Sequence, residues 1–232
     1  MNAVVHLGWA FDDRAIGKVV CTNLLGTMNL LEAALREGIR RFVFASTAVV
    51  YGPTADRKAT EGDLLQPRRS TIGGPFYAAT KGACEAYCDR YRTQGLPVTV
   101  LRLHGVFGAD RLGPFEAMIA AARRGNALRP IAGAGGEYMH LEDTLDVVAL
   151  CLADPRAEGE TFNVAGTHTY SDVELARFIA EQAGGCDVRP IEEPAQAMVS
   201  VRIDKLRHTL EYTPRHGDFL PSLIEDRLRG AT

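Results

Sequence analysis

The chain has 232 residues, which is enough to bury a substantial core in one large domain. With 46% hydrophobic and 24% charged residues and a formal net charge of −3, it has the composition of a soluble globular protein and lacks the basic surplus that neutralises phosphates. Its apolar runs are shorter than the roughly 20 residues of a membrane span. These features argue against a nucleic-acid or membrane partner and favour a small-molecule substrate.

The first third of the chain predicts a parallel sheet covered by helices. Residues 3–7 form a short apolar run, 12–38 carry a long helical pattern that stops at a glycine, and 41–46 form a second apolar run. Neither run alternates with polar residues, as is typical of strands buried on both faces.

The remainder continues this alternation and then becomes less regular. Residues 47–74 are rich in Gly, Pro and Thr and are expected to form a loop at the carboxyl end of a strand, where substrate sites are built. A helix carrying Tyr77 should run to about residue 94. Further strands are expected at 98–103, 128–131, 138–141 and 161–164, and further helices at 114–124, 142–153, 171–183 and near the C-terminus.

Cysteine and histidine spacing predicts no metal site. The five cysteines are scattered and odd in number, and we see no signal peptide, so we expect reduced thiols in a cytoplasmic protein. Cys84 and Cys88 lack the further ligands of a zinc site and are expected to be small buried residues. His6, His104 and His140 show no metal-binding spacing either.

Tyr77 and Lys81 are the strongest candidates for chemistry. They lie four residues apart, so both side chains project from one face of the predicted helix. An ammonium beside a phenol lowers the phenol's pKa from about 10 and lets it exchange protons with a substrate. A hydroxyl from Thr47 could hold the substrate oxygen that gains or loses that proton.

These residues stand among motifs of one known family. In order and approximate spacing, the chain resembles the extended short-chain dehydrogenase/reductases, in particular the NAD-dependent epimerase/dehydratase branch. The matching segments are residues 5–8, 23–27, 29–34, 42–47, 50–52, 77–81, 101–102 and 140–143.

The resemblance implies roles for individual residues. Tyr77 would be the catalytic acid/base, Lys81 would lower its pKa and hold the nicotinamide ribose, and Thr47 would position the oxygen on the reacting carbon. Substrate contacts would also come from His104 and Gly105. The cofactor, NAD or NADP, would lie against Leu7, Gly8, Asn23, Ala45, Ser46, Lys81 and His104.

The chain also departs from the family pattern. The glycine-rich turn that binds the dinucleotide pyrophosphate would precede residue 1, because the sequence enters the pattern at the family's fourth strand. Losing even two charge-assisted hydrogen bonds there would weaken NAD binding about a hundredfold. Gly105 and Gly136 stand where many relatives place residues that contact the nucleotide diphosphate, which disfavours a nucleotide-sugar substrate.

We therefore expect an α/β fold: a truncated Rossmann-like, doubly wound parallel sheet with a small C-terminal α/β substrate region. Residues 1–104 would form the partial core, and 105–232 the rest of the core and the substrate region. Three functions remain open: an NAD(P)-dependent epimerase/dehydratase-like enzyme, a cofactor-independent isomerase, lyase or cyclase using Tyr77, and a non-catalytic binding or scaffold protein. The apolar strand at 3–7 would be a sheet edge, covered by a homodimer partner, another chain or a later segment.

Overall fold

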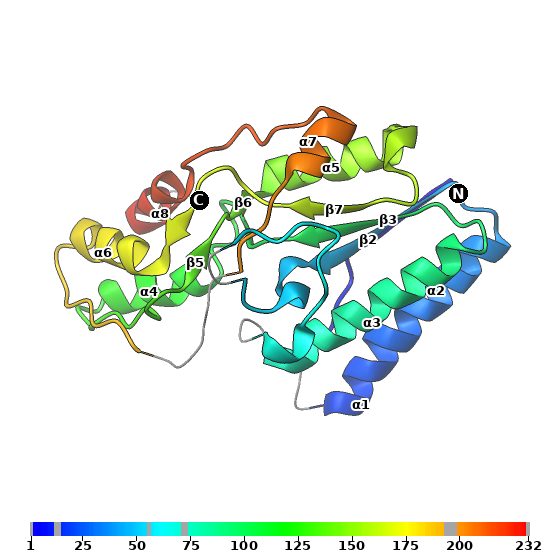
Figure 1. The fold of residues 1–232 in the computed structure, drawn as a ribbon. Coiled ribbons are helices and arrows are strands. Elements are labelled where there is room, and N and C mark those ends of the chain that lie inside the picture. The colour runs from blue at the N-terminus through cyan, green and yellow to red at the C-terminus, as the bar shows by residue number, and fades with distance from the viewer. Residues whose placement is uncertain (1, 12–14, 55–56, 71–73, 193–198, 231–232) are drawn as a thin grey trace.

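The structure is a computed structural model that describes residues 2–11, 15–54, 57–70, 74–192 and 199–230. Its centre is a four-stranded, all-parallel sheet in the order β1-β2-β3-β7 (Figure 1). The strands are β1 (Ala3–His6), β2 (Arg41–Thr47), β3 (Val98–Leu103) and β7 (Thr161–Val164). All of β2 after its first residue is buried, which confirms the expectation of a strand covered on both faces.

Helices cover both faces of this sheet, as expected for a doubly wound fold (Figure 1). One layer is formed by α1 (Ile16–Val19), the π-helical turns η2 (Val20–Leu25), α2 (Gly26–Arg36) and α3 (Gly74–Arg92). The opposite layer contains α5 (Leu141–Ala153) and α7 (Asp204–Leu210). The helix expected over 12–38 is confirmed from Ile16 to Arg36, whereas residues 12–14 lie outside the described part of the chain.

A second hydrophobic cluster forms a smaller lobe beside the carboxyl ends of the strands (Figure 1). Its helices are α4 (Pro114–Ala122), α6 (Asp172–Gln182) and α8 (Leu220–Arg229). The lobe also contains two short strand pairs. In one, β4 (Val106–Phe107) pairs with β6 (Met139–His140), and in the other, β5 (Gly135–Gly136) pairs with β8 (Tyr170–Ser171). The strand expected at 128–131 is reduced to isolated bridges at Leu128 and Ile131. Single-turn 3-10 helices complete the chain at η3 (Ala48–Tyr51), η4 (Pro67–Arg69) and η5 (Pro155–Ala157).

The smaller lobe draws all its core residues from beyond Gly105, but β7 returns from this part of the sequence to the main sheet. The expected division into 1–104 and 105–232 remains a prediction. At the other side of the sheet, β1 pairs only with β2 among the described strands. Val5 is 36% exposed and Leu7 is 56% exposed. No later described strand covers this edge, so a homodimer or partner chain remains the predicted cover.

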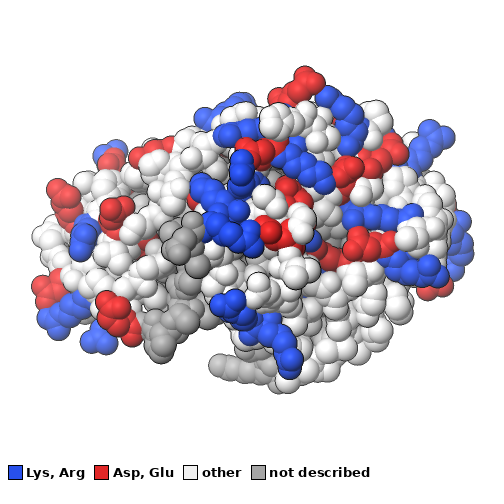
Figure 2. All heavy atoms as spheres, viewed as in Figure 1, with Lys and Arg blue, Asp and Glu red and all other residues white. Residues whose placement is uncertain are grey.

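The surface and the cysteines agree with the composition. Acidic and basic side chains are interspersed on the face shown in Figure 2. None of the described helices is both long and apolar enough to span a bilayer. All five cysteines are unpaired, and Cys84, Cys88 and Cys151 are fully buried, as small apolar side chains would be.

A buried ion pair joins α3 to the sheet. Arg102 on β3 donates to Glu85 on α3 through Nη2, at 2.7 Å, and both residues are buried. Its Nη1 donates to the Tyr51 hydroxyl at 2.6 Å, and this hydroxyl donates to Asn163 on β7 at 2.8 Å. Asp143 takes no part in this group, because it accepts hydrogen bonds from the segment before α8.

We predict that Arg102→Met lowers the free energy of unfolding by about 3–5 kcal/mol, because it leaves the Glu85 carboxylate buried without its cation. Arg156→Met is the control: Arg156 is half exposed and pairs with Asp154 at the surface, so its loss should cost far less. Urea denaturation measures both values. Equal costs for the two variants would show that the buried pair does not hold α3.

Candidate active site

A cleft with a volume of about 470 Å³ opens at the carboxyl ends of the first three strands. This is the edge of a doubly wound sheet at which ligands bind. Residues from the strand ends, α3 and the start of the smaller lobe line it: Leu7, Trp9, Phe11, Ala45, Ser46, Thr47, Val49, Tyr77, Lys81, Leu103, Gly105, Val106, Phe107, Arg111, Gly113 and Pro114. The three residues expected to be catalytic therefore meet in one cleft, together with four of the other expected site residues.

Tyr77 and Thr47 form the polar centre of this cleft. The Thr47 hydroxyl lies close enough to the Tyr77 hydroxyl to influence the pKa of Tyr77. Thr47 ends β2 and caps η3, because its Oγ1 accepts the N–H of Val49 at 3.4 Å. Burial raises the pKa of Tyr77, while the Thr47 hydrogen bond and the charge of Arg111 act in the opposite direction. The net direction is opposite to the one expected from the sequence, because desolvation of the phenolate outweighs the cations around it.

Lys81 is almost completely buried, and its ammonium contacts a backbone carbonyl and an aromatic ring. Its Nζ donates to the carbonyl oxygen of Ala45 at 2.5 Å and lies 3.7 Å from the centroid of the Trp9 ring. Burial lowers the pKa of Lys81 from 10.5 to about 8, although Cys84, Glu85 and Cys88 favour the ammonium. A lysine that titrates near neutrality suits a proton-transfer site. Its ammonium is not among the groups that shift the pKa of Tyr77.

Ser46 ties the floor of the cleft to the buried ion pair. Its Oγ donates a short hydrogen bond to the Glu85 carboxylate. The same carboxylate accepts hydrogen bonds from Arg102. Glu85 lies one helical turn beyond Lys81 on α3. The same contacts that hold α3 on the sheet therefore set the position of Lys81.

Asn23 holds one wall of the cleft without lining it. The side chain is buried, its Oδ1 accepts the N–H of Ala10 at 2.8 Å, and its Nδ2 donates to the Ala10 carbonyl at 2.9 Å. These two bonds fix the loop on which Trp9 and Phe11 approach the Tyr77 ring, with centroid distances of 6.1 and 5.8 Å. The structure thus gives Asn23 a place behind the aromatic wall. Gly8, on the exposed loop that follows β1, does not line the cleft either.

His104 also lies outside the cleft, although the sequence placed it beside both cofactor and substrate. It is 4% exposed, its Nδ1 lies 3.0 Å from the Glu137 carbonyl oxygen, and its ring stacks on Tyr138. The close packing around His104 and Tyr138 explains why glycine occupies positions 136 and 105. A Cβ on Gly136 would lie 2.1 Å from His104, and one on Gly105 would lie 2.4 Å from Tyr138. Both glycines are required by this close packing, and only Gly105 lines the cleft.

Sequence reasoning missed Arg111 and understated Trp9. Arg111 follows the short strand β4 and contributes the cation that acts on Tyr77. No motif marked it, because it sits in a loop without helical or strand spacing. Trp9 and Phe11 stand out in the sequence only as large aromatic residues that follow an apolar run.

Comparison with known proteins decides the family. Residues 1–165 match the profile of the NAD dependent epimerase/dehydratase family. The chain belongs to this family. It is 34% identical over 186 residues to the low-salt glycan biosynthesis protein Agl12 of Haloferax volcanii, covering 75% of this chain and 57% of that protein. It is 31% identical over 241 residues to dTDP-glucose 4,6-dehydratase of Streptomyces niveus, covering 97% of this chain and 68% of that enzyme.

A solved structure of an epimerase/dehydratase family relative supports the fold. DesIV, the dTDP-glucose 4,6-dehydratase of Streptomyces venezuelae, was determined with NAD and TYD bound. It superposes with a TM-score of 0.81 at 26% identity, covering 99% of this chain and 72% of that one. The chain spans about half to two thirds of the length of the curated relatives it matches.

Because Trp9 is the only tryptophan, its fluorescence should report the charge of Lys81. The lowered pKa keeps the ammonium charged below about pH 8 and neutral above it. We predict a change in Trp9 emission with a midpoint near pH 8 that disappears in Lys81→Met. Lys18→Met, an exposed lysine on α1, should keep the transition. A transition that persists in Lys81→Met would assign it to another group.

Proposed function

We propose that this chain carries the acid/base site of an epimerase/dehydratase-type enzyme that uses NAD or NADP. The observation that carries the proposal is the meeting of Tyr77 and Thr47 in one cleft with a buried Lys81 of lowered pKa. Family membership supports this choice over a scaffold role. A purely structural protein would gain nothing from burying a lysine whose ammonium loses most of its hydration.

Tyr77 would exchange the proton of a substrate hydroxyl. Its Oη lies beside Thr47 Oγ1, so a substrate oxygen bound between them can donate to one hydroxyl and accept from the other. Arg111 favours the phenolate that forms when Tyr77 gives up its proton. Thr47 is fixed at the end of a buried strand and therefore holds that oxygen with little loss of side-chain entropy.

The cleft residues fit the nicotinamide end of a dinucleotide. Leu7 and Ala45 offer apolar surface at the strand ends, and Lys81 offers an ammonium for ribose hydroxyls. When bound, NAD or NADP supplies the hydride acceptor and donor for the reacting carbon. In the described conformation Trp9 lies over the Lys81 ammonium, so a ribose that reaches Lys81 must displace this ring.

The substrate would be a sugar carried on a nucleotide, or a similar hydroxy or carbonyl compound. Relatives named as dTDP-glucose 4,6-dehydratase and as UDP-N-acetyl-alpha-D-glucosaminuronate decarboxylase favour the nucleotide sugar. The glycines at 105 and 136 favoured other substrates, but both are needed for packing around Tyr138 and His104. A nucleotide diphosphate would therefore have to be held by other residues of the chain.

A second candidate is proton transfer without a cofactor, as in an isomerase, lyase or cyclase. The specific observation behind it is the position of Trp9, whose ring centroid lies 3.7 Å from the Lys81 ammonium where a cofactor ribose would bind. Tyr77 and Thr47 remain accessible to the cleft under this arrangement. Cofactor binding separates the two candidates.

We predict that Tyr77→Phe reduces turnover of dTDP-glucose or UDP-glucuronic acid with NAD by at least about a hundredfold, because the general acid/base is lost. The variant keeps the aromatic ring and should keep the native thermal midpoint. Tyr87→Phe, on the same helix, is the matched control and should retain activity. Unchanged turnover in Tyr77→Phe would refute the assigned role.

We further predict that calorimetric titration detects NAD(H) or NADP(H) binding that weakens about tenfold or more in Lys81→Met, because a charge-assisted hydrogen bond is removed. Lys18→Met should bind as the native chain does. If neither dinucleotide binds while Tyr77-dependent turnover persists, the cofactor-independent candidate replaces the first one.

A further inference from the structure

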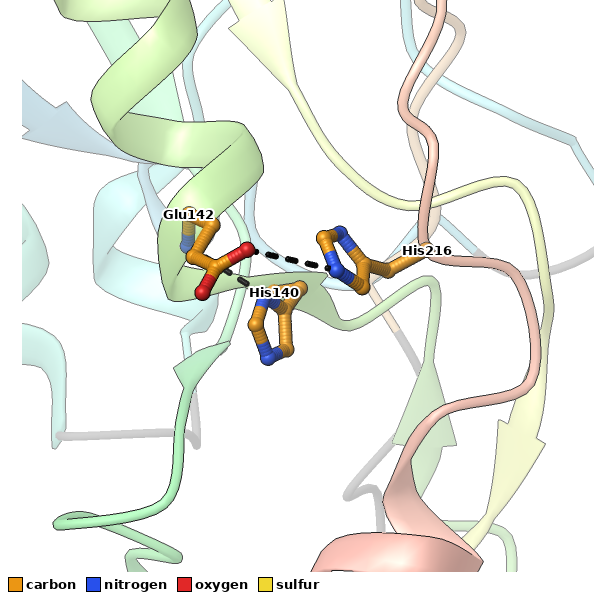
Figure 3. Close-up of side chains that lie close together, drawn as sticks. All are labelled: His140, Glu142 and His216. Carbon is orange, nitrogen blue, oxygen red and sulfur yellow. Dashed lines mark hydrogen bonds and ion pairs between the residues drawn. The ribbon is translucent and has the colours of Figure 1, made fainter.

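Three potential metal ligands gather at the start of α5. His140 ends β6, Glu142 lies in the first turn of α5, and His216 lies in the segment that leads to α8. Figure 3 shows the three side chains lying together, with the carboxylate of Glu142 directed toward the His216 ring. Their nitrogen and oxygen ligand atoms all lie within 4.8 Å of one another. None of these residues lines the candidate active site, so the inference is independent of the proposed function.

His216 is prepared to act as a ligand. Its Nδ1 lies 3.0 Å from Oδ2 of Asp143, and because a carboxylate only accepts, Nδ1 carries the proton. The lone pair of Nε2 is then free, and Nε2 lies 3.5 Å from Glu142 Oε2. Asp143 is fully buried and also accepts the backbone N–H groups of Arg215 and His216 at 2.9 and 3.0 Å. A histidine oriented by a fixed carboxylate is the arrangement that supports metal-bound imidazoles.

His140 supplies a second imidazole next to the first. The rings stack with centroids 3.9 Å apart and planes inclined by 24°. Its Nδ1 faces Glu142 and receives only a long hydrogen bond of 3.3 Å from that residue's N–H. Tetrahedral zinc with bonds of 2.0–2.1 Å needs ligand atoms about 3.3 Å apart. The Glu142 side chain is 66% exposed and free to turn, so rotation of Glu142 and His140 can close the remaining separation.

The local charge favours a cation. Glu142, Asp143 and Asp146 contribute three carboxylates along the start of α5. Arg215 is the cation that pairs with them, through Asp146 at 2.5 Å. The carboxylates outnumber it, and their negative charge also exceeds the roughly half positive charge at a helix N-terminus.

We propose that His140, Glu142 and His216 bind one zinc ion, with a fourth position left to water. Two imidazoles and one carboxylate suit zinc, and three protein ligands leave the open coordination position of such sites. The ion would join the start of α5, which packs on the main sheet, to the segment before α8 in the smaller lobe. Its binding energy would thus stabilise the contact between these two parts of the folded chain.

The test uses the chelator-treated chain without an affinity tag. Zinc titrated by calorimetry should bind with one equivalent, and cobalt should give the visible absorption of a tetrahedral site. His216→Ala and Glu142→Gln should each lose this binding. His208→Ala removes an exposed histidine of α7 and should bind as the native chain does. Asp143→Asn should weaken zinc by about 10–100-fold if Asp143 orients the ligand.

Thermal unfolding adds a readout that does not depend on activity. Zinc should raise the unfolding midpoint of the native chain and of His208→Ala but not that of His216→Ala. Absence of zinc binding in the native chain overturns the proposal. Equal binding by native, His216→Ala and Glu142→Gln chains also overturns it, because zinc would then occupy another site. Glu142→Gln changes an exposed side chain, so it keeps the test decisive even if His216→Ala fails to fold.

Discussion

The buried ion pair between Glu85 and Arg102 is the interaction on which the arrangement of the cleft depends. Removing both charges from water costs several kcal/mol per ion, and additional hydrogen bonds must offset that cost. Here Ser46 and Tyr51 provide them, so the pair is shared among α3, the end of β2 and the turn after it. These contacts hold the helix in its orientation on the sheet.

This orientation explains the electrostatics of Tyr77 and Lys81. With α3 fixed, the Lys81 side chain points toward the end of β2. There its ammonium contacts the Ala45 carbonyl oxygen and the Trp9 ring. Tyr77, one turn earlier, lies against Thr47 and below Phe11. Burial therefore shifts the two pKa values in opposite directions, lowering that of the lysine and raising that of the tyrosine. At neutral pH Tyr77 is therefore a phenol, whereas Lys81 remains an ammonium up to about pH 8.

The polar group around Asp143, at the start of α5, is held by different contacts. At the start of α5, Asp143 gathers backbone N–H groups and one imidazole from a segment distant in sequence. That carboxylate fixes the path of the chain before α8 and, as a consequence, presents His216 to Glu142. A structural carboxylate thereby creates the geometry of a possible ligand set, without any contribution from the cleft around Tyr77.

The sequence by itself determined the parallel sheet, its covering helices, the family and the Tyr77–Lys81–Thr47 group. Unbroken apolar runs and helical spacing are local properties, and α3 places residues four apart on one face whatever surrounds it. Only the tertiary structure decided the partner of Arg102, the burial of His104 behind Gly136, the place of Arg111 and the meeting of His140 with His216. These contacts join residues far apart in the chain, and no periodicity records which side chains meet. The same holds for the pKa of Tyr77, because its direction is set by desolvation, which depends on everything packed around the ring.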